Sequence, residues 1–172
     1  PGGFSYGDYL RTGAIARFSP IMNSVINDAK KGKPVIGICN GFQILLECGL
    51  LPGALINNKN IKFLSKKVLL EVVSNESIFS NKLNIGDTLK MPIAHKQGNY
   101  IANKDVIDKL NDQNRIVFKY KSNPNGSVVD IAGITNEKGN VLGMMPHPER
   151  ACDPILGSDD GKLIFASMLN RY

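Results

Sequence analysis

A cysteine flanked by glycines, placed where an apolar run meets a helical pattern, is the feature that most constrains the fold. The sequence Gly-Ile-Cys-Asn-Gly at residues 37–41 follows an apolar run that begins at Pro34, and it leads into Phe-Gln-Ile-Leu-Leu at residues 42–46. The glycines let the backbone turn sharply from strand to helix, and the first N–H groups of that helix point at the sulfur. Because this environment favours the thiolate, we predict that Cys39 is a nucleophile.

The surrounding pattern predicts one α/β domain over residues 1–172. Residues 33–38 are predicted to form a buried strand and residues 40–48 a helix that ends at Gly49. A further helix is expected between Pro20 and Gly32, strands at residues 67–73, 88–93, 115–120, 127–135 and 141–145, and a closing helix from about residue 158. The turn sequence at residues 136–140 predicts that the last two strands pair antiparallel. We therefore expect a parallel sheet with an antiparallel extension, and Cys39 at the carboxyl end of a parallel strand, where ligands bind.

A cysteine nucleophile needs a general base, and the base needs a group that orients it. His147 follows the strand predicted at residues 141–145 and stands between two prolines, which keep its backbone out of helix and ladder pairing. Glu149 comes two residues later, on the same side of an extended segment, so its carboxylate can hold the imidazole. Together these residues predict a triad of Cys39, His147 and Glu149.

Each member of this triad also has an ordinary interpretation. A cysteine is often a small buried hydrophobe, a histidine between prolines is often a turn residue, and Glu149 could be a surface carboxylate paired with Arg150. The combination favours catalysis, because a scaffold needs none of the three residues. We interpret Cys48 and Cys152 as structural.

His95 is the competing base. It also follows a predicted strand, and Gly98 lies shortly after it, so His95 could line the same pocket or could be a structural turn residue. No carboxylate is adjacent in the sequence, which makes His95 the weaker candidate.

Composition narrows the class of protein. With 42% hydrophobic and 21% charged residues, the chain can bury one sizeable core, and no apolar run reaches the roughly 18 residues that span a bilayer. The three cysteines are odd in number and lack zinc-ribbon spacing, so we expect a reduced, cytoplasmic setting and no metal site. The net charge of +6 comes from scattered lysines, which indicates a solvated surface rather than a nucleic-acid site and leaves an anionic protein partner or a phosphorylated substrate open. Without a long apolar run, no membrane is expected as a partner.

The motif at residues 37–43, taken with His147-Pro148-Glu149, resembles the triad-type (class I) glutamine amidotransferases. Longer strings at residues 1–11, 91–95 and 143–150 are similar to those of the glutaminase subunits of phosphoribosylformylglycinamidine synthases, enzymes of purine biosynthesis. The similarity runs from the first residue to the last helix. It implies a flavodoxin-like fold, with about one further βαβ unit expected before Pro1.

The resemblance also implies a reaction and its partners. Cys39 would attack the side-chain amide of glutamine, His147 would pass a proton to the departing ammonia, and Glu149 would hold His147. Ammonia would then pass to a large synthetase subunit that uses ATP and magnesium, often with a small accessory subunit. The chain shows no phosphate-binding loop, so no cofactor is expected in this chain.

Further site residues follow from the same resemblance. The backbone N–H of Asn40 and that of Gly3 or Gly2 would hold the oxyanion of each tetrahedral intermediate. Gln43 matches a position that helps form the substrate pocket, and His95 would be a pocket wall.

Two other functions remain open from the sequence. Another intracellular cysteine hydrolase or peptidase on a related α/β scaffold would share Cys39 but would need neither Gln43 nor the His-Pro-Glu sequence. A non-catalytic regulatory subunit or a thiol redox sensor would keep the cysteine turn for structure, and the full set of Cys39, His147 and Glu149 argues against it, because a scaffold needs none of them. Glutamine specificity separates the first alternative, and hydrolysis of any kind separates the second.

Overall fold

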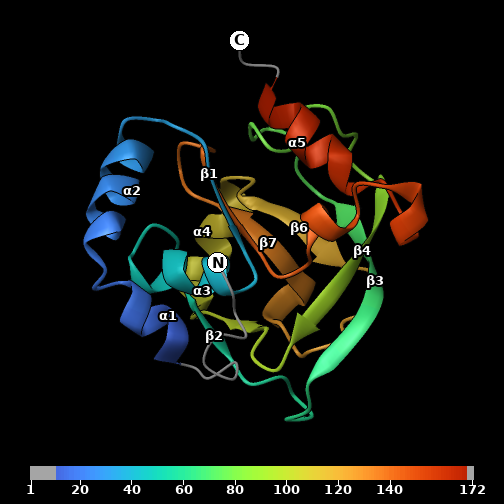
Figure 1. Ribbon diagram of the computed structural model, residues 1–172, viewed down its shortest axis with the longest axis horizontal. Helices are drawn as coiled ribbons and strands as arrows, with labels where there is room; N and C mark the ends of the chain where they lie inside the picture. The colour runs from blue at the N-terminus through green and yellow to red at the C-terminus, as the bar shows by residue number, and fades with distance from the viewer. Residues whose placement is uncertain (1–10, 170–172) are drawn as a thin grey trace.

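The computed structural model describes residues 11–169 of the chain (Figure 1). Its helices are α1 (Arg11–Ala16), α2 (Pro20–Lys30), α3 (Asn40–Glu47), α4 (Lys104–Asp112) and α5 (Gly161–Leu169), with 3-10 turns η1 (Val128–Asp130), η2 (Pro148–Arg150) and η3 (Pro154–Leu156). Its strands are β1 (Val35–Ile38), β2 (Ala54–Ile56), β3 (Leu64–Val72), β4 (Thr88–His95), β5 (Asn99–Ile101), β6 (Ile116–Tyr120), β7 (Ile131–Thr135) and β8 (Val141–Met144). None of these helices is long and apolar enough to cross a membrane.

A mixed sheet forms the centre of the fold. Six strands pair in the order β1-β8-β7-β6-β3-β4, and β2 pairs with β5 in a separate ribbon. The pair β1 and β8 is parallel, and all the other pairs in the large sheet are antiparallel. The expected α/β fold, with parallel strands at the cysteine turn and an antiparallel extension, is therefore confirmed. The expected preceding βαβ unit stays a prediction.

Apolar side chains cover both faces of this sheet. On β8, Leu142 joins a cluster that includes Ile164 of α5, whereas Val141 joins a second cluster that includes Phe42 of α3 and Leu110 of α4. This alternation is the normal consequence of strand geometry. At the two ends of the arrangement, α1 packs against α3 and α5 lies near β4 (Figure 1).

Helix α3 lies directly on the strands because two glycines leave room for it. A Cβ atom at Gly143 would lie 2.1 Å from Cδ2 of Phe42 and 2.6 Å from Cδ1 of Leu51, and one at Gly37 would lie 2.6 Å from the Gly41 carbonyl oxygen. Among the described atoms, a Cβ at Gly41 itself would meet nothing within 4 Å. Of the two glycines that flank the cysteine, Gly37 is thus the one that this close approach requires.

The strand predicted at residues 33–38 is shorter and less buried than expected. It spans Val35–Ile38, and three of its four residues are only half-buried. Within residues 11–169, β1 pairs with β8 alone and lies at the edge of the sheet, which leaves its other side uncovered.

The strand predicted at residues 127–135 begins later than expected. Residues Val128–Asp130 form a 3-10 turn, in which Val129 and Asp130 have φ angles of 51° and 60°. Such positive φ angles cannot continue a strand, so β7 begins only at Ile131.

Four elements were absent from the sequence-based prediction, namely α1, α4, β2 and β5. Helix α4 had a readable signal, because Asn103 caps it by accepting from the Val106 N–H at 2.9 Å, and Val106, Ile107 and Leu110 recur at helical spacing. The strands β2 and β5 have three residues each, and only their antiparallel pairing defines them.

We predict that Gly143→Ala destabilises the fold, because the added methyl group overlaps the Phe42 ring. Overpacking of a well-filled core typically lowers the free energy of unfolding by about 1–3 kcal/mol. Urea denaturation of the two proteins measures the difference. A second change, Phe42→Leu, makes room for the methyl group, so the effects of the two substitutions should be less than additive. Unchanged stability of Gly143→Ala would contradict the close approach.

Candidate active site

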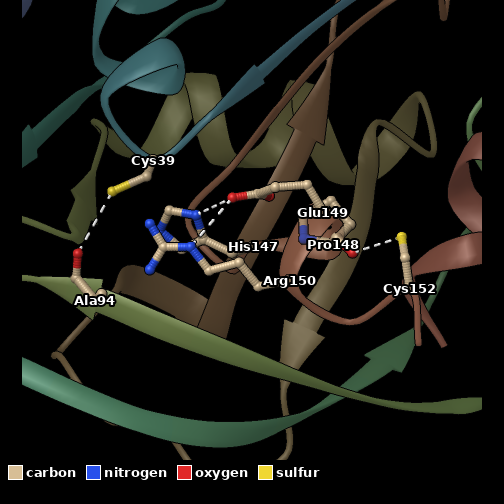
Figure 2. Close-up of polar contacts among 7 residues, drawn as sticks. All are labelled: Cys39, Ala94, His147, Pro148, Glu149, Arg150 and Cys152. Carbon is tan, nitrogen blue, oxygen red and sulfur yellow. Dashed lines mark hydrogen bonds and ion pairs between the residues drawn. The ribbon is translucent and has the colours of Figure 1, made fainter. Parts of the chain in front are cut away.

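Cys39 occupies the sharp turn between β1 and α3. Its φ and ψ angles of 54° and −105° are strained for a residue that is not glycine. Its N–H donates to the Met144 carbonyl at 2.8 Å, which continues the parallel pairing of β1 and β8 by one residue. The side chain is buried, and Sγ donates to the carbonyl of Ala94 at the end of β4, at 3.7 Å (Figure 2). The strained turn predicted from the glycine-flanked motif is confirmed.

His147 and Glu149 form a close pair at the end of β8. Imidazole Nδ1 lies 2.6 Å from carboxylate Oε1, as Figure 2 shows. The predicted contact is present, but the reason given for it was wrong. The segment is not extended beyond His147, because residues Pro148–Arg150 form a 3-10 turn that folds the carboxylate back to the ring.

The charges around this pair define the tautomer of His147. Partial burial opposes ionisation of Glu149, but the hydrogen bond and charge of His147, together with nearby Arg150, outweigh it and lower the pKa of the carboxyl group. The guanidinium Nε of Arg150 lies 3.5 Å from Oε1 of Glu149. An ionised Glu149 can only accept, so Nδ1 of His147 must donate. Nε2 is then an acceptor in the neutral ring, and it is buried without a hydrogen-bond partner among the described residues.

Parallel pairing brings the thiol and this imidazole to the same side of the sheet, where β1 and β8 have their carboxyl ends. Ile38 is in register with Met144, so Cys39 and His147 both emerge just beyond the carboxyl ends of neighbouring strands. The end of β4 passes both of them, since its Ala94 carbonyl contacts the sulfur and its Pro92 carbonyl accepts from the His147 N–H at 2.9 Å. This arrangement can supply a nucleophile, a base and an orienting carboxylate.

His95 lies at the end of β4 and is fully buried. Its Nδ1 is 3.0 Å from Oδ1 of Asn58. Burial, reinforced by the charge of nearby His147, lowers the pKa of His95 to about 4. His95 is therefore neutral near pH 7 and is a poor proton acceptor, which favours the pocket-wall interpretation over that of a competing base.

Residues 1–161 of the chain match the CobB/CobQ-like glutamine amidotransferase domain. The chain belongs to this family. A chain in the structure of PurLQS from Thermotoga maritima is 47% identical to this amidotransferase, with a TM-score of 0.90, and the match covers 99% of this chain and 76% of that one.

Two more distant structures share the fold of this amidotransferase. A proposed component of a GMP synthase from Thermoplasma acidophilum is 18% identical, with a TM-score of 0.55, and the match covers 87% of this chain and 62% of that one. A glutamine amidotransferase from Thermotoga maritima is also 18% identical, with a TM-score of 0.51 and coverage of 87% and 60%.

The structure of the amidotransferase brings most of the sequence-predicted site residues together. Gln43 is buried one turn into α3, and its Nε2 donates to Oε1 of Gln97, two residues beyond His95, at 3.3 Å. Asn40 is the first residue of α3, and its Oδ1 is buried with no partner within residues 11–169. Gly2 and Gly3, predicted for the oxyanion hole, lie outside the described residues.

Sequence reasoning missed Asn58. This asparagine lies far from the motifs along the chain, and no local pattern marks it, yet it contacts the His95 ring. Burial raises the pKa of the Cys48 and Cys152 thiols, and their structural interpretation stays a prediction. The Cys152 thiol donates to the Pro148 carbonyl at 3.1 Å (Figure 2).

A separate cavity of about 590 Å³ lies at the far end of α3 from Cys39. Residues 49–52 form one wall, and Lys30, Arg115 and Lys138 lie on the others. The Lys138 ammonium donates to the Lys30 carbonyl and the Arg115 guanidinium donates to the Thr135 carbonyl, both at 3.0 Å, so two of its cations already have partners in the fold. Its lining includes none of Cys39, His147 and Glu149.

We predict that acid destabilises the protein partly through Glu149. Its pKa in the folded state lies below the ordinary value of 4.5, so its contribution to stability is complete above that pH and is lost as the pH falls through the lowered pKa. In Glu149→Gln this part of the acid sensitivity should disappear. Urea unfolding of both proteins between pH 3 and pH 7 measures it. Parallel pH profiles for the two proteins would contradict the assigned pair.

Proposed function

We propose that this amidotransferase hydrolyses glutamine through Cys39, His147 and Glu149, as the glutaminase subunit of a phosphoribosylformylglycinamidine synthase. The observation that carries the proposal is the 2.6 Å contact between Nδ1 of His147 and Oε1 of Glu149, placed beside a strained cysteine on the adjacent parallel strand. The motif resemblance and the 47% identity to the PurLQS chain support the choice of enzyme.

The reaction follows from the positions of these three side chains. Nε2 of His147 takes the thiol proton, and the sulfur of Cys39 attacks the amide carbon of glutamine. The carbon–nitrogen bond breaks as His147 returns the proton to the leaving nitrogen, which gives ammonia and a thioester. His147 then takes a proton from water, whose oxygen attacks the thioester carbon. The carbon–sulfur bond breaks, glutamate is released, and His147 returns the proton to the sulfur of Cys39. Throughout, Glu149 holds Nδ1 and stabilises the imidazolium.

The start of α3 supplies one donor for the oxyanion. As the first residue of a helix, Asn40 has a backbone N–H with no acceptor within the helix. This N–H follows the nucleophile directly, as an oxyanion donor in a nucleophile elbow does. The second donor would be the N–H of Gly3 or Gly2. Gln43, buried beside Gln97, would form part of the wall that holds the substrate.

The products and partners follow from the same function. Glutamine is the nitrogen source, and a synthetase subunit receives the ammonia. We further infer that a small accessory subunit joins them, and that ATP and magnesium bind to the synthetase. A cytoplasmic location is supported by Cys39, Cys48 and Cys152, none of which forms a disulfide in the described part of the chain.

We predict that Cys39→Ser and His147→Ala each reduce glutamine-dependent synthesis by roughly 10³-fold or more, because each removes a bond-making or proton-carrying group. For Glu149→Ala we expect a smaller loss, since the base remains but is no longer oriented. Ammonia-dependent synthesis by the assembled complex is the control and should persist. Full glutamine-dependent synthesis in Cys39→Ser would refute the nucleophile assignment.

The experiment that tests the proposal directly is labelling with a glutamine-derived diazoketone, followed by intact-mass analysis and peptide mapping. We predict a single adduct on Cys39 that free glutamine prevents, because only a glutamine pocket around an activated thiol gives both results. A general thiol reagent serves as the control for accessibility. Labelling that glutamine does not reduce would favour another cysteine hydrolase instead.

A further inference from the structure

Asn58 is a buried residue whose side chain hydrogen-bonds both to His95 at the end of β4 and to Gly98, in the segment that follows β4. Its side chain is 1% exposed. Nδ2 donates to the carbonyls of Lys62 and His95, both at 2.9 Å, and Oδ1 lies 3.0 Å from Nδ1 of His95 and accepts from the Gly98 N–H at 3.1 Å. The backbone N–H donates to the Lys96 carbonyl at 2.8 Å. Every polar atom of this side chain is therefore engaged.

These bonds determine the tautomer of His95. Because Nδ2 of Asn58 is fixed as the donor to two carbonyls, Oδ1 must face the ring and can only accept. Nδ1 of His95 therefore carries the proton. Nε2 is left with a lone pair, and it is buried without a hydrogen-bond partner in the described part of the chain. A buried acceptor of this kind normally has a partner, so a hydrogen-bond donor on a bound molecule would suit this atom.

The His95 ring lies near the reaction site. The preceding residue, Ala94, contacts the sulfur of Cys39 through its carbonyl, and the charge of His147 reaches the His95 ring. Gly98 packs against that ring so closely that a Cβ atom there would lie 2.3 Å from Cε1. The ring is thus held both by Asn58 and by the glycine.

We propose that Asn58 is a positioning residue that holds His95 as the Nδ1–H tautomer, so that Nε2 accepts a hydrogen bond from a nitrogen of bound glutamine. This inference rests on the proposed glutaminase function. Glutamine carries N–H donors at its carboxamide and its ammonium group, whereas an imidazolium at His95 would be a second donor and would repel the ammonium group. Neutral His95 accepts and His147 exchanges protons, so the two histidines have separate tasks.

The tautomer can be measured without turnover, by nitrogen NMR of the chain labelled with ¹⁵N-histidine. The sequence has two histidines, and His95→Asn assigns the signals. We expect His95 to show a protonated Nδ1 and an unprotonated Nε2 at pH 7, and to remain neutral until the pH approaches about 4. In Asn58→Asp the added carboxylate should raise the pKa of His95 above that value. An Nε2–H tautomer, or an imidazolium at pH 7, in the wild-type protein would overturn the proposal.

A matched pair of substitutions then tests the role of Nε2. An asparagine at position 95 can keep the donor to Asn58 but removes the distal acceptor, whereas a glutamine can place an amide oxygen near the position of Nε2. In the assembled complex, we expect His95→Asn to raise the KM for glutamine about tenfold or more, the value of one good hydrogen bond, with kcat changed less than threefold. His95→Gln should recover much of the affinity.

The outcomes separate this proposal from the one on which it rests. Ammonia-dependent synthesis shows whether each variant complex is intact. Equal KM values for His95→Asn and the wild-type protein, with glutamine-dependent synthesis present, would overturn the role of His95 alone. Absence of any glutamine use by the wild-type complex would overturn the proposed function. The tautomer of His95 measured by NMR is independent of that result, because it requires no turnover.

Discussion

The parallel pairing of β1 and β8 is the constraint on which the rest of the site depends. It sets Ile38 opposite Met144, and the N–H of Cys39 extends it through the Met144 carbonyl. Two strands that run in the same direction end on the same side of the sheet, so the proposed nucleophile Cys39 and the proposed base His147 lie at that side together, although they are 108 positions apart in the sequence. A shift of one residue in this register would turn the side chains to the opposite face and separate the two groups.

Packing beneath α3 maintains the strained backbone of Cys39. A residue held at such φ and ψ angles costs about 1–3 kcal/mol, and it persists only where the surrounding structure determines it. Here Phe42 is fully buried, its ring stacks on Tyr100 with centroids 5.9 Å apart, and its contact with Gly143 presses the helix onto β8. The same contacts that stabilise the core therefore aim the first N–H groups of the helix at the site, which links stability to the electrostatics of the thiol.

The parts of the site that were predicted from the sequence are those whose geometry is local. Cys39 lies at a strand-to-helix junction with a glycine at position 37, and Glu149 lies two residues from His147, so short motifs carried both features. Asn58 could not be found in this way, because it contacts a ring 37 positions away in the sequence. Its surroundings are built from segments near β2, β4 and β5, which only the tertiary fold brings together. The 3-10 turn after His147 was also missed. Its sequence is equally compatible with extended backbone, and the contact between Glu149 and His147 that accompanies the turn is not visible in the sequence.

His95 and His147 have different properties because different side chains contact their rings. His147 contacts a carboxylate, which accepts from Nδ1 and orients the ring, whereas His95 contacts a neutral amide in a fully buried position, which favours the uncharged ring. Each neighbour also accepts a hydrogen bond from Nδ1–H, so both rings keep Nε2 for other partners. Since two adjacent imidazolium ions would repel each other, the low pKa of His95 leaves a single group free to take the proton from the thiol. In the proposed mechanism, the amide of Asn58 and the carboxylate of Glu149 thus give two identical side chains different tasks: His95 holds the substrate and His147 moves protons.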